Sequence, residues 1–181
     1  EASDVATAIY DGADAVMLSA ESASGKFTVE AVAMMDRIIA QTEADPHYRD
    51  AIDASHTQPA ANTADAIGWA ARSVAGLLDV AAMVAYTSSG SSALLMARER
   101  PRAPIIGMTP KRETARRLAL VWGVNPVVCD DVTGVDDMTA RAVSTATSMH
   151  FAQSGQTLVI AAGMPFGTPG STNLLRIAQI D

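Results

Sequence analysis

The chain has 181 residues, of which 49% are hydrophobic and 18% are charged. A chain of this size and composition buries one core of ordinary domain size and leaves room for one further small element. The 20 acidic residues outnumber the 13 basic ones, and the net charge of −7 disfavours nucleic acid as a partner. The longest apolar stretch, residues 74–86, is interrupted by Gly76 and Asp79 and falls short of the roughly 18 residues of a membrane span, so no membrane association is expected.

The cysteine content and the first residues indicate a cytoplasmic protein. Cys129 is the one cysteine, which excludes an intrachain disulfide and a cysteine metal cage. His47, His56 and His150 lack HxxxH spacing, so no metal site is expected from them. The opening EASDVATAIYDG has no basic start and no long apolar segment, so we expect no signal peptide. It also begins within a helical pattern and without Met, so we expect a fragment of a longer protein.

Residues 1–43 predict a helix, a strand and a second helix. Gly12 is expected to end the first helix, and the apolar residues 15–18 are expected to form a short buried strand. Apolar positions within 29–39 define one face of an amphipathic helix. The intervening segment SAESASGKFT is polar and contains glycine, as do the functional strand-to-helix loops of barrels.

A change of composition at residues 44–61, with two prolines and few large apolar residues, indicates a domain boundary. Beyond it, short apolar strands alternate with amphipathic helices, which predicts a three-layer α/β domain with a mostly parallel five-stranded sheet. The last two strands are joined by a segment without room for a helix, so the last strand is expected to be antiparallel at the sheet edge. The expected helices are 62–78, 92–100, 111–119 and 135–153, and the expected strands are 82–86, 104–108, 125–129, 157–162 and 174–180.

The serine loop, residues 86–92, follows an apolar strand and precedes a helix. Such a turn presents unpaired backbone N–H groups and the positive end of the helix dipole, and Ser and Thr hydroxyls add donors. It lies at the carboxyl end of a strand, where open α/β sheets bind ligands, so a phosphate monoester is the expected ligand. The alternative, that Ser91 or Ser92 only caps the helix, stays open from the residues alone.

The glycine loop, residues 163–170, follows another strand of the same predicted sheet. If both strands are parallel, both loops open at one sheet edge, and the glycine loop can fold over a ligand of the serine loop. The alternative is a tight hairpin connection stiffened by proline.

Long segments of the chain resemble the pyruvate kinase family. SDVATAIYDGADAVMLSAESASGKFTVEAV is similar to that family's signature around its last barrel strand, MLSxE, and the following helix. YTSSGSSALLMARERPRAPIIGMT and GTPGSTNLLRI are similar to its C-terminal domain. The resemblance implies that residues 1–43 are the end of a (β/α)₈ barrel, residues 44–61 a linker, and residues 62–181 the C-terminal allosteric α/β domain.

For the intact enzyme, the resemblance implies phosphoryl transfer from phosphoenolpyruvate to ADP in glycolysis, with Mg²⁺ and in many members K⁺. The family's catalytic lysine and acidic metal ligands lie on earlier barrel strands. This chain alone is therefore expected to be inactive and to bind no metal or other cofactor. Ser19 and Glu21, in the MLSAE segment, are the candidate catalytic residues, and they are expected only at the rim of the active site.

The resemblance also implies an effector site. In members activated by sugar phosphates, the turn that corresponds to the serine loop binds one phosphate, and the loop that corresponds to the region of Gly170 closes over it. Ser88 and Ser91 stand where the members activated by fructose bisphosphate often have basic residues, and no tryptophan precedes the helix after Cys129, so we expect a sugar monophosphate or AMP. The candidate effector phosphate-binding residues are Thr87, Ser88, Ser89, Gly90, Ser91, Ser92 and Gly170.

Two other interpretations remain. The serine loop, its helix and the next strand are also typical of a sugar-phosphate-binding module of the sugar isomerase type, although that module does not explain the first 35 residues. Alternatively, the second domain is only an oligomer interface and the serine loop only a helix cap. Pyruvate kinases are typically tetramers that use this domain for subunit contacts, so a homo-oligomer is expected in either case.

Overall fold

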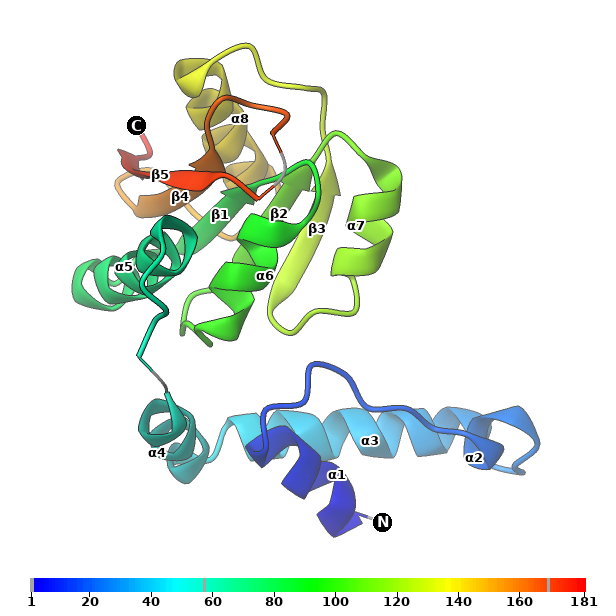
Figure 1. The fold of residues 1–181 in the computed structure, drawn as a ribbon. Coiled ribbons are helices and arrows are strands. Elements are labelled where there is room, and N and C mark those ends of the chain that lie inside the picture. Colours follow the sequence, from blue (N-terminus) through cyan, green and yellow to red (C-terminus); the bar gives the residue numbers. More distant parts are fainter. Residues whose placement is uncertain (1, 57, 169) are drawn as a thin grey trace. The chain divides into compact units, whose positions relative to one another are not determined.

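The computed structural model describes residues 2–56, 58–168 and 170–181, which Figure 1 shows as a ribbon. The chain forms two compact units, residues 1–57 (unit 1) and residues 58–181 (unit 2). The division falls within the segment 44–61, where the composition changes. None of the helices described is both long enough and apolar enough to cross a bilayer.

Unit 1 consists of helices around a small core. Ile9, Tyr48 and Ile52 are buried together in this core. The rings of Tyr10 and Tyr48 meet edge to face with their centroids 5.9 Å apart, and the Tyr10 hydroxyl donates to the Asp45 carboxylate at 3.1 Å. The helices are α1 (Ala2–Tyr10), α2 (Ala20–Ala23), α3 (Thr28–Glu43) and α4 (Pro46–Ser55).

Unit 1 differs from the sequence prediction in two places. The strand expected at residues 15–18 is absent, and Met17 within it is 87% exposed. A parallel strand is stable only when it is hydrogen-bonded to neighbouring strands, and the described part of unit 1 contains none. The segment 44–61 contains α4, which begins at Pro46 after Asp45, whose carboxylate accepts the His47 N–H at 2.9 Å.

Unit 2 is a five-stranded sheet with the strand order β3-β2-β1-β4-β5. The first four of these strands are mutually parallel, and β5 pairs with β4 in the antiparallel sense, as the sequence predicts. The strands are β1 (Ala82–Tyr86), β2 (Ile105–Thr109), β3 (Val124–Val128), β4 (Thr157–Gly163) and β5 (Thr172–Gln179), and the helices are α5 (Thr63–Leu78), α6 (Ser91–Arg98), α7 (Arg112–Leu118) and α8 (Val135–Ser148).

Helices cover both faces of the sheet, which gives the expected three layers (Figure 1). Alternate residues of β1 point to opposite faces. Val84 packs in the cluster that contains the α8 residue Met138, while Met83 packs in the cluster that contains α5, α6 and α7 residues such as Met96. Because β1, β2 and β4 are buried on both faces, their sequences are continuous apolar runs.

Local signals set the helix boundaries. The Asn62 side chain accepts the Asp65 N–H at 2.9 Å and so caps α5 at the position predicted. Helix α8 ends at Ser148, five residues before the predicted end at 153, and His150 has a left-handed backbone with φ of 60°. That conformation cannot continue a right-handed helix.

Candidate functional site

The serine loop and the glycine loop meet at one edge of the sheet. They follow β1 and β4, which are adjacent and parallel, with Tyr86 opposite Ala162. An open pocket lies between the loops. The residues that line it are Tyr86, Thr87, Ser88, Ser89, Ser91, Ser92, Gly163, Phe166, Gly167, Thr168, Gly170 and Ser171.

Six of the seven candidate effector residues line this pocket, and the seventh, Gly90, forms the turn beneath it. Gly90 has φ of 97°, a left-handed conformation that disfavours residues with a side chain. Its N–H donates to the Thr87 hydroxyl at 2.9 Å, which closes the turn. A Cβ atom at this position would also lie 3.4 Å from Leu118 and 3.5 Å from Thr114. These are ordinary van der Waals distances, so the backbone conformation, and not a lack of space, favours glycine here.

The turn leaves backbone donors unused. The N–H of Thr87 donates to Met108 across the sheet, and the N–H of Ser91 makes only a long contact of 3.4 Å with the Ser89 hydroxyl. Among the residues that the structure describes, no hydrogen bond is made by the N–H groups of Ser88, Ser89 or Ser92. Donors at the N-terminus of a helix attract anions because the helix dipole adds to their charge.

The Ser92 hydroxyl, which lines the pocket, is hydrogen-bonded to a buried hydroxyl of β5. The Ser92 and Thr172 oxygens are 2.7 Å apart, and both side chains are 3% exposed. One of the two hydroxyl protons lies between the oxygens, so the other hydroxyl proton can be donated to a further acceptor. Thr172 could not be identified from the sequence, because its position beside Ser92 depends on the pairing of β5 with β4. The polar run Gly170-Ser171-Thr172 before the last strand was the only signal.

Side-chain bonds and an aromatic contact hold the glycine loop. Asn173 accepts the Met164 N–H and donates to the Met164 carbonyl, both at 2.8 Å, while the Ser171 hydroxyl donates to the Thr168 carbonyl at 2.8 Å. The Phe166 ring meets the Tyr86 ring edge to face with centroids 5.5 Å apart. This contact ties the glycine loop to the end of β1.

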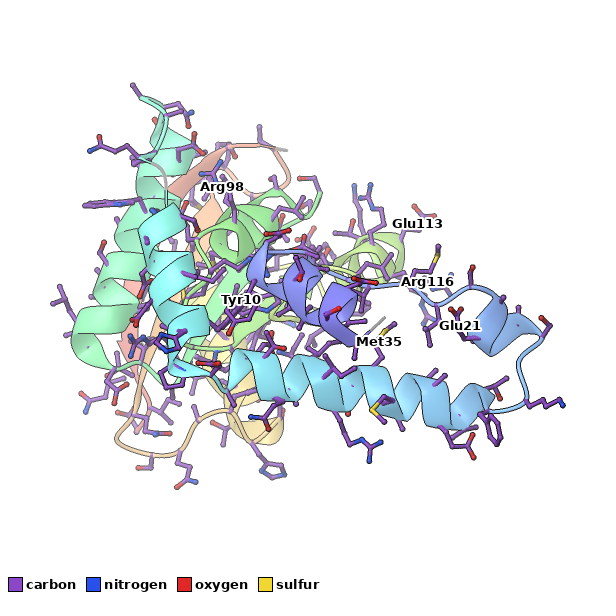
Figure 2. The ribbon with its side chains drawn as sticks, turned by 90° about the horizontal axis from the view of Figure 1, so that it is seen from below. Tyr10, Glu21, Met35, Arg98, Glu113 and Arg116 are labelled. Carbon is purple, nitrogen blue, oxygen red and sulfur yellow. The ribbon has the colours of Figure 1, made fainter. Side chains whose placement is uncertain are left out.

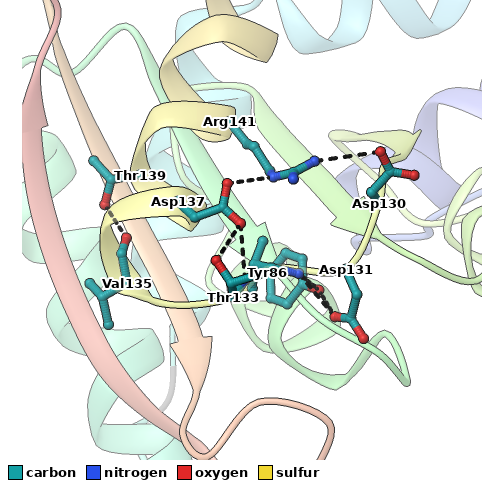
Figure 3. Close-up of polar contacts among 9 residues, drawn as sticks. Tyr86, Asp130, Asp131, Thr133, Val135, Asp137, Thr139 and Arg141 are labelled. Carbon is teal, nitrogen blue, oxygen red and sulfur yellow. Dashed lines mark hydrogen bonds and ion pairs between the residues drawn. The ribbon is translucent and has the colours of Figure 1, made fainter.

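Tyr86 connects the pocket to the segment before α8 (Figure 3). Its hydroxyl donates to the Asp131 carboxylate and accepts the Val132 N–H at 3.2 Å. Burial, followed by the hydrogen bond to Asp131, raises the pKa of Tyr86 well above its ordinary value. The phenol therefore stays neutral and acts as a fixed donor.

A second polar group beside it holds the start of α8 (Figure 3). The Asp137 carboxylate accepts the Thr133 N–H at 2.9 Å and pairs with Arg141 at 2.8 Å. The Thr133 N–H, followed by Arg141, holds the pKa of Asp137 below its ordinary value. These bonds fix the loop that carries Asp131.

The candidate catalytic residues Ser19 and Glu21 lie in unit 1, at the start of the one-turn helix α2, and both are exposed. Figure 2 labels Glu21, whose carboxylate accepts the Ser19 N–H at 3.1 Å. Backbone hydrogen bonds from Glu21 itself and then from Ser19 lower the pKa of this carboxyl. In the part of the chain that the structure describes, no group of three or more His, Cys, Asp or Glu side chains could hold a metal ion.

Two family models match different parts of the chain. Residues 65–178 match the family described as pyruvate kinase, alpha/beta domain, and residues 1–32 match pyruvate kinase, barrel domain. The chain is 51% identical to a pyruvate kinase of Methylorubrum extorquens over 180 residues, which cover 99% of this chain and 38% of that protein. It is 47% identical to a pyruvate kinase of Agrobacterium vitis (99% and 37% covered) and 44% identical to one of Geobacillus stearothermophilus (99% and 31% covered). The chain thus spans less than two fifths of the length of these relatives, and it belongs to the pyruvate kinase family.

Proposed function

We propose that this chain is the C-terminal part of a pyruvate kinase and that unit 2 binds the phosphate group of a phosphorylated effector between the serine loop and the glycine loop. The observation that supports this is the convergence of unused N–H groups of Ser88, Ser89 and Ser92 at one open pocket with the Ser92 hydroxyl, which is hydrogen-bonded to Thr172. Backbone amides at a helix N-terminus, together with hydroxyls, are the groups that bind phosphate without a metal.

The charge of the pocket favours a ligand with a single phosphate. None of the described residues that line it is charged, and the carboxylate of Asp131 lies behind Tyr86. A bisphosphate would bring a second dianion with no lining cation to neutralise it. A sugar monophosphate or AMP is therefore the proposed effector.

For the intact protein we propose the activity of the family, phosphoryl transfer from phosphoenolpyruvate to ADP in glycolysis, in a cytoplasmic homotetramer. Unit 1 would be the end of the catalytic barrel, with Ser19 and Glu21 at the active-site rim. Large apolar side chains exposed in unit 1 support this, because they need a packing partner outside the described residues. They are Met17, Phe27, Val29, Val32 and Met34.

Mg²⁺ and K⁺ belong to the proposed activity of the intact enzyme, but the described residues of this chain do not fit them. Such ions require several oxygen ligands that converge on one point. Glu21, the acidic candidate residue, instead accepts hydrogen bonds from its own backbone and from Ser19. We assign no metal-binding role to this chain, and we propose that it is catalytically inactive alone.

Calorimetric titration of the chain with ribose 5-phosphate, glucose 6-phosphate, AMP and fructose 1,6-bisphosphate tests the effector site. A monophosphate should bind more tightly than the bisphosphate. Ser92→Ala and Ser89→Ala should each weaken binding by about tenfold, the usual effect of losing one hydrogen bond to a charged group. Ser144→Ala, on the exposed side of α8, is the matched control and should leave affinity unchanged.

Two outcomes would contradict the proposal. If none of the four compounds produces heat, the serine loop is not a phosphate site and the second unit is structural; the serines then have no capping role either, because the N-cap of α6 is Gly90, with no side-chain cap. If a compound binds with the same affinity to wild type and to both serine variants, it binds at another site.

A further inference from the structure

Helix α7 contacts the serine loop from outside the pocket. The Thr114 hydroxyl donates to the Ser88 carbonyl at 3.0 Å, and the Arg117 guanidinium donates to the Ser89 carbonyl at 3.3 Å. Arg117 also donates to the Thr114 hydroxyl at 3.4 Å, which joins the two contacts. Neither Thr114 nor Arg117 lines the pocket. Both therefore act on the backbone of the loop.

These contacts set the direction of the loop's donors. The loop has no cis peptide bond, and in a trans peptide the carbonyl and the following N–H point in opposite directions. Because α7 holds the Ser88 carbonyl, the Ser89 N–H is turned away from α7. That N–H has no partner among the described residues, whereas the next one, of Gly90, is bonded to Thr87. Helix α7 thus determines where the unused Ser89 donor points.

Arg117 also brings a positive charge to the loop. Ser88 and Ser91 are neutral, so the loop itself supplies no cation. In the described chain, Arg117 is the charged residue with a hydrogen bond to the serine-loop backbone. Arg117 is exposed, as are the other charged residues of α7, which include Glu113 and Arg116, labelled in Figure 2.

We propose that Arg117 is a positioning and specificity-determining residue of the phosphate pocket. Its hydrogen bond to the Ser89 carbonyl fixes the loop with the amide donors available to the ligand, and its charge favours a phosphate dianion over a neutral sugar. This inference rests on the proposed function, because it concerns the same pocket.

The test is a titration of the full 181-residue chain with ribose 5-phosphate and with inorganic phosphate, followed by calorimetry and by the NMR shift of the Ser89 amide. Arg117→Gln should weaken binding of both probes by about tenfold, because the charge-assisted hydrogen bond from the guanidinium to the Ser89 carbonyl is lost. Arg117→Lys keeps the charge and should restore affinity to within about threefold of wild type. Arg112→Gln, the same charge change at an exposed position of α7, is the control and should have little effect.

The readouts separate this inference from the proposed function. If wild type binds ribose 5-phosphate and Arg117→Gln binds it equally well, the inference about Arg117 is wrong, while the proposed phosphate site still stands. If Arg117→Lys is as weak as Arg117→Gln, the charge assignment is wrong. If wild type binds neither probe, both proposals fail. An unchanged unfolding midpoint in Arg117→Gln, together with weaker binding and a reduced dependence of affinity on salt, would support the assignment.

Discussion

Replacing Tyr86 by Phe removes one hydroxyl at the end of β1 and leaves the ring. The hydroxyl donates to Asp131 and accepts the Val132 N–H. After the change, the Val132 N–H keeps its bond to the Asp131 carboxylate at 3.1 Å, and Asp131 is exposed to water. Neither partner is left buried without a hydrogen bond, so the expected loss is near the lower end for a bond to a charged group, about 1.5 kcal/mol.

Urea unfolding followed by tryptophan fluorescence measures this loss. Both tryptophans, Trp69 and Trp122, belong to unit 2, so the signal reports that unit. A loss of about 1.5 kcal/mol lowers the midpoint by about 1 M if the slope is about 1.5 kcal/mol per M. Tyr10→Phe removes a comparable hydroxyl-to-carboxylate bond in unit 1 and is the matched control. Equal midpoints for wild type and Tyr86→Phe would refute the reasoning.

The same variant has a distinct pH dependence. Burial raises the pKa of Tyr86 above its ordinary value of 10.0, so above about pH 10 the unfolded phenol ionises while the folded one stays neutral. The unfolded state then binds fewer protons, and stability falls as pH rises. Tyr86 is the only tyrosine of residues 58–181, so this alkaline loss should be shallower in Tyr86→Phe.

Two further predictions concern unit 2. Gly90→Ala should lower the free energy of unfolding by about 1–2 kcal/mol, because its φ of 97° is unfavourable with a Cβ. Gly134→Ala, at an extended position with open space around it, should have little effect in the same urea experiment. The hydrogen bond from Arg98, followed by that from Asn62, lowers the pKa of Asp65. The charged Asp65 carboxylate therefore stabilises the fold above its ordinary pKa of 3.8, and this stabilisation is lost as the pH falls through the pKa of the folded state. Arg98→Gln should therefore unfold at a higher pH in an acid titration followed by circular dichroism, and an unchanged midpoint would exclude this role of the ion pair.

Much of unit 2 could be predicted because its strands are buried on both faces. A strand such as β1 must then be a continuous apolar run between turn residues, and its predicted range, 82–86, matches the structure. The meeting of the two loops followed from the parallel pairing of their strands. By contrast, residues 15–18 have an equally apolar sequence but no strand beside them in the described part of unit 1. Local sequence cannot report whether the partners of a strand are present.

Two residues that support the pocket from behind show the same limit. Thr172 and Arg117 reach the site through the pairing of β5 and the packing of α7, which no short motif encodes. The early end of α8 depends on His150, a residue without the conformational freedom of glycine. Helix α4 could have been found, since Asp45-Pro46 is a common beginning of a helix.

The bond between Ser92 and Thr172 joins residues 80 positions apart. A nascent chain that leaves the ribosome can form β1, the serine loop and α6 long before the last strand has been synthesised. The complete pair of hydroxyls exists only after β5 has docked against β4. Any compound that needs both hydroxyls would therefore select fully folded chains and protect them from degradation, while incomplete ones would stay open to proteases.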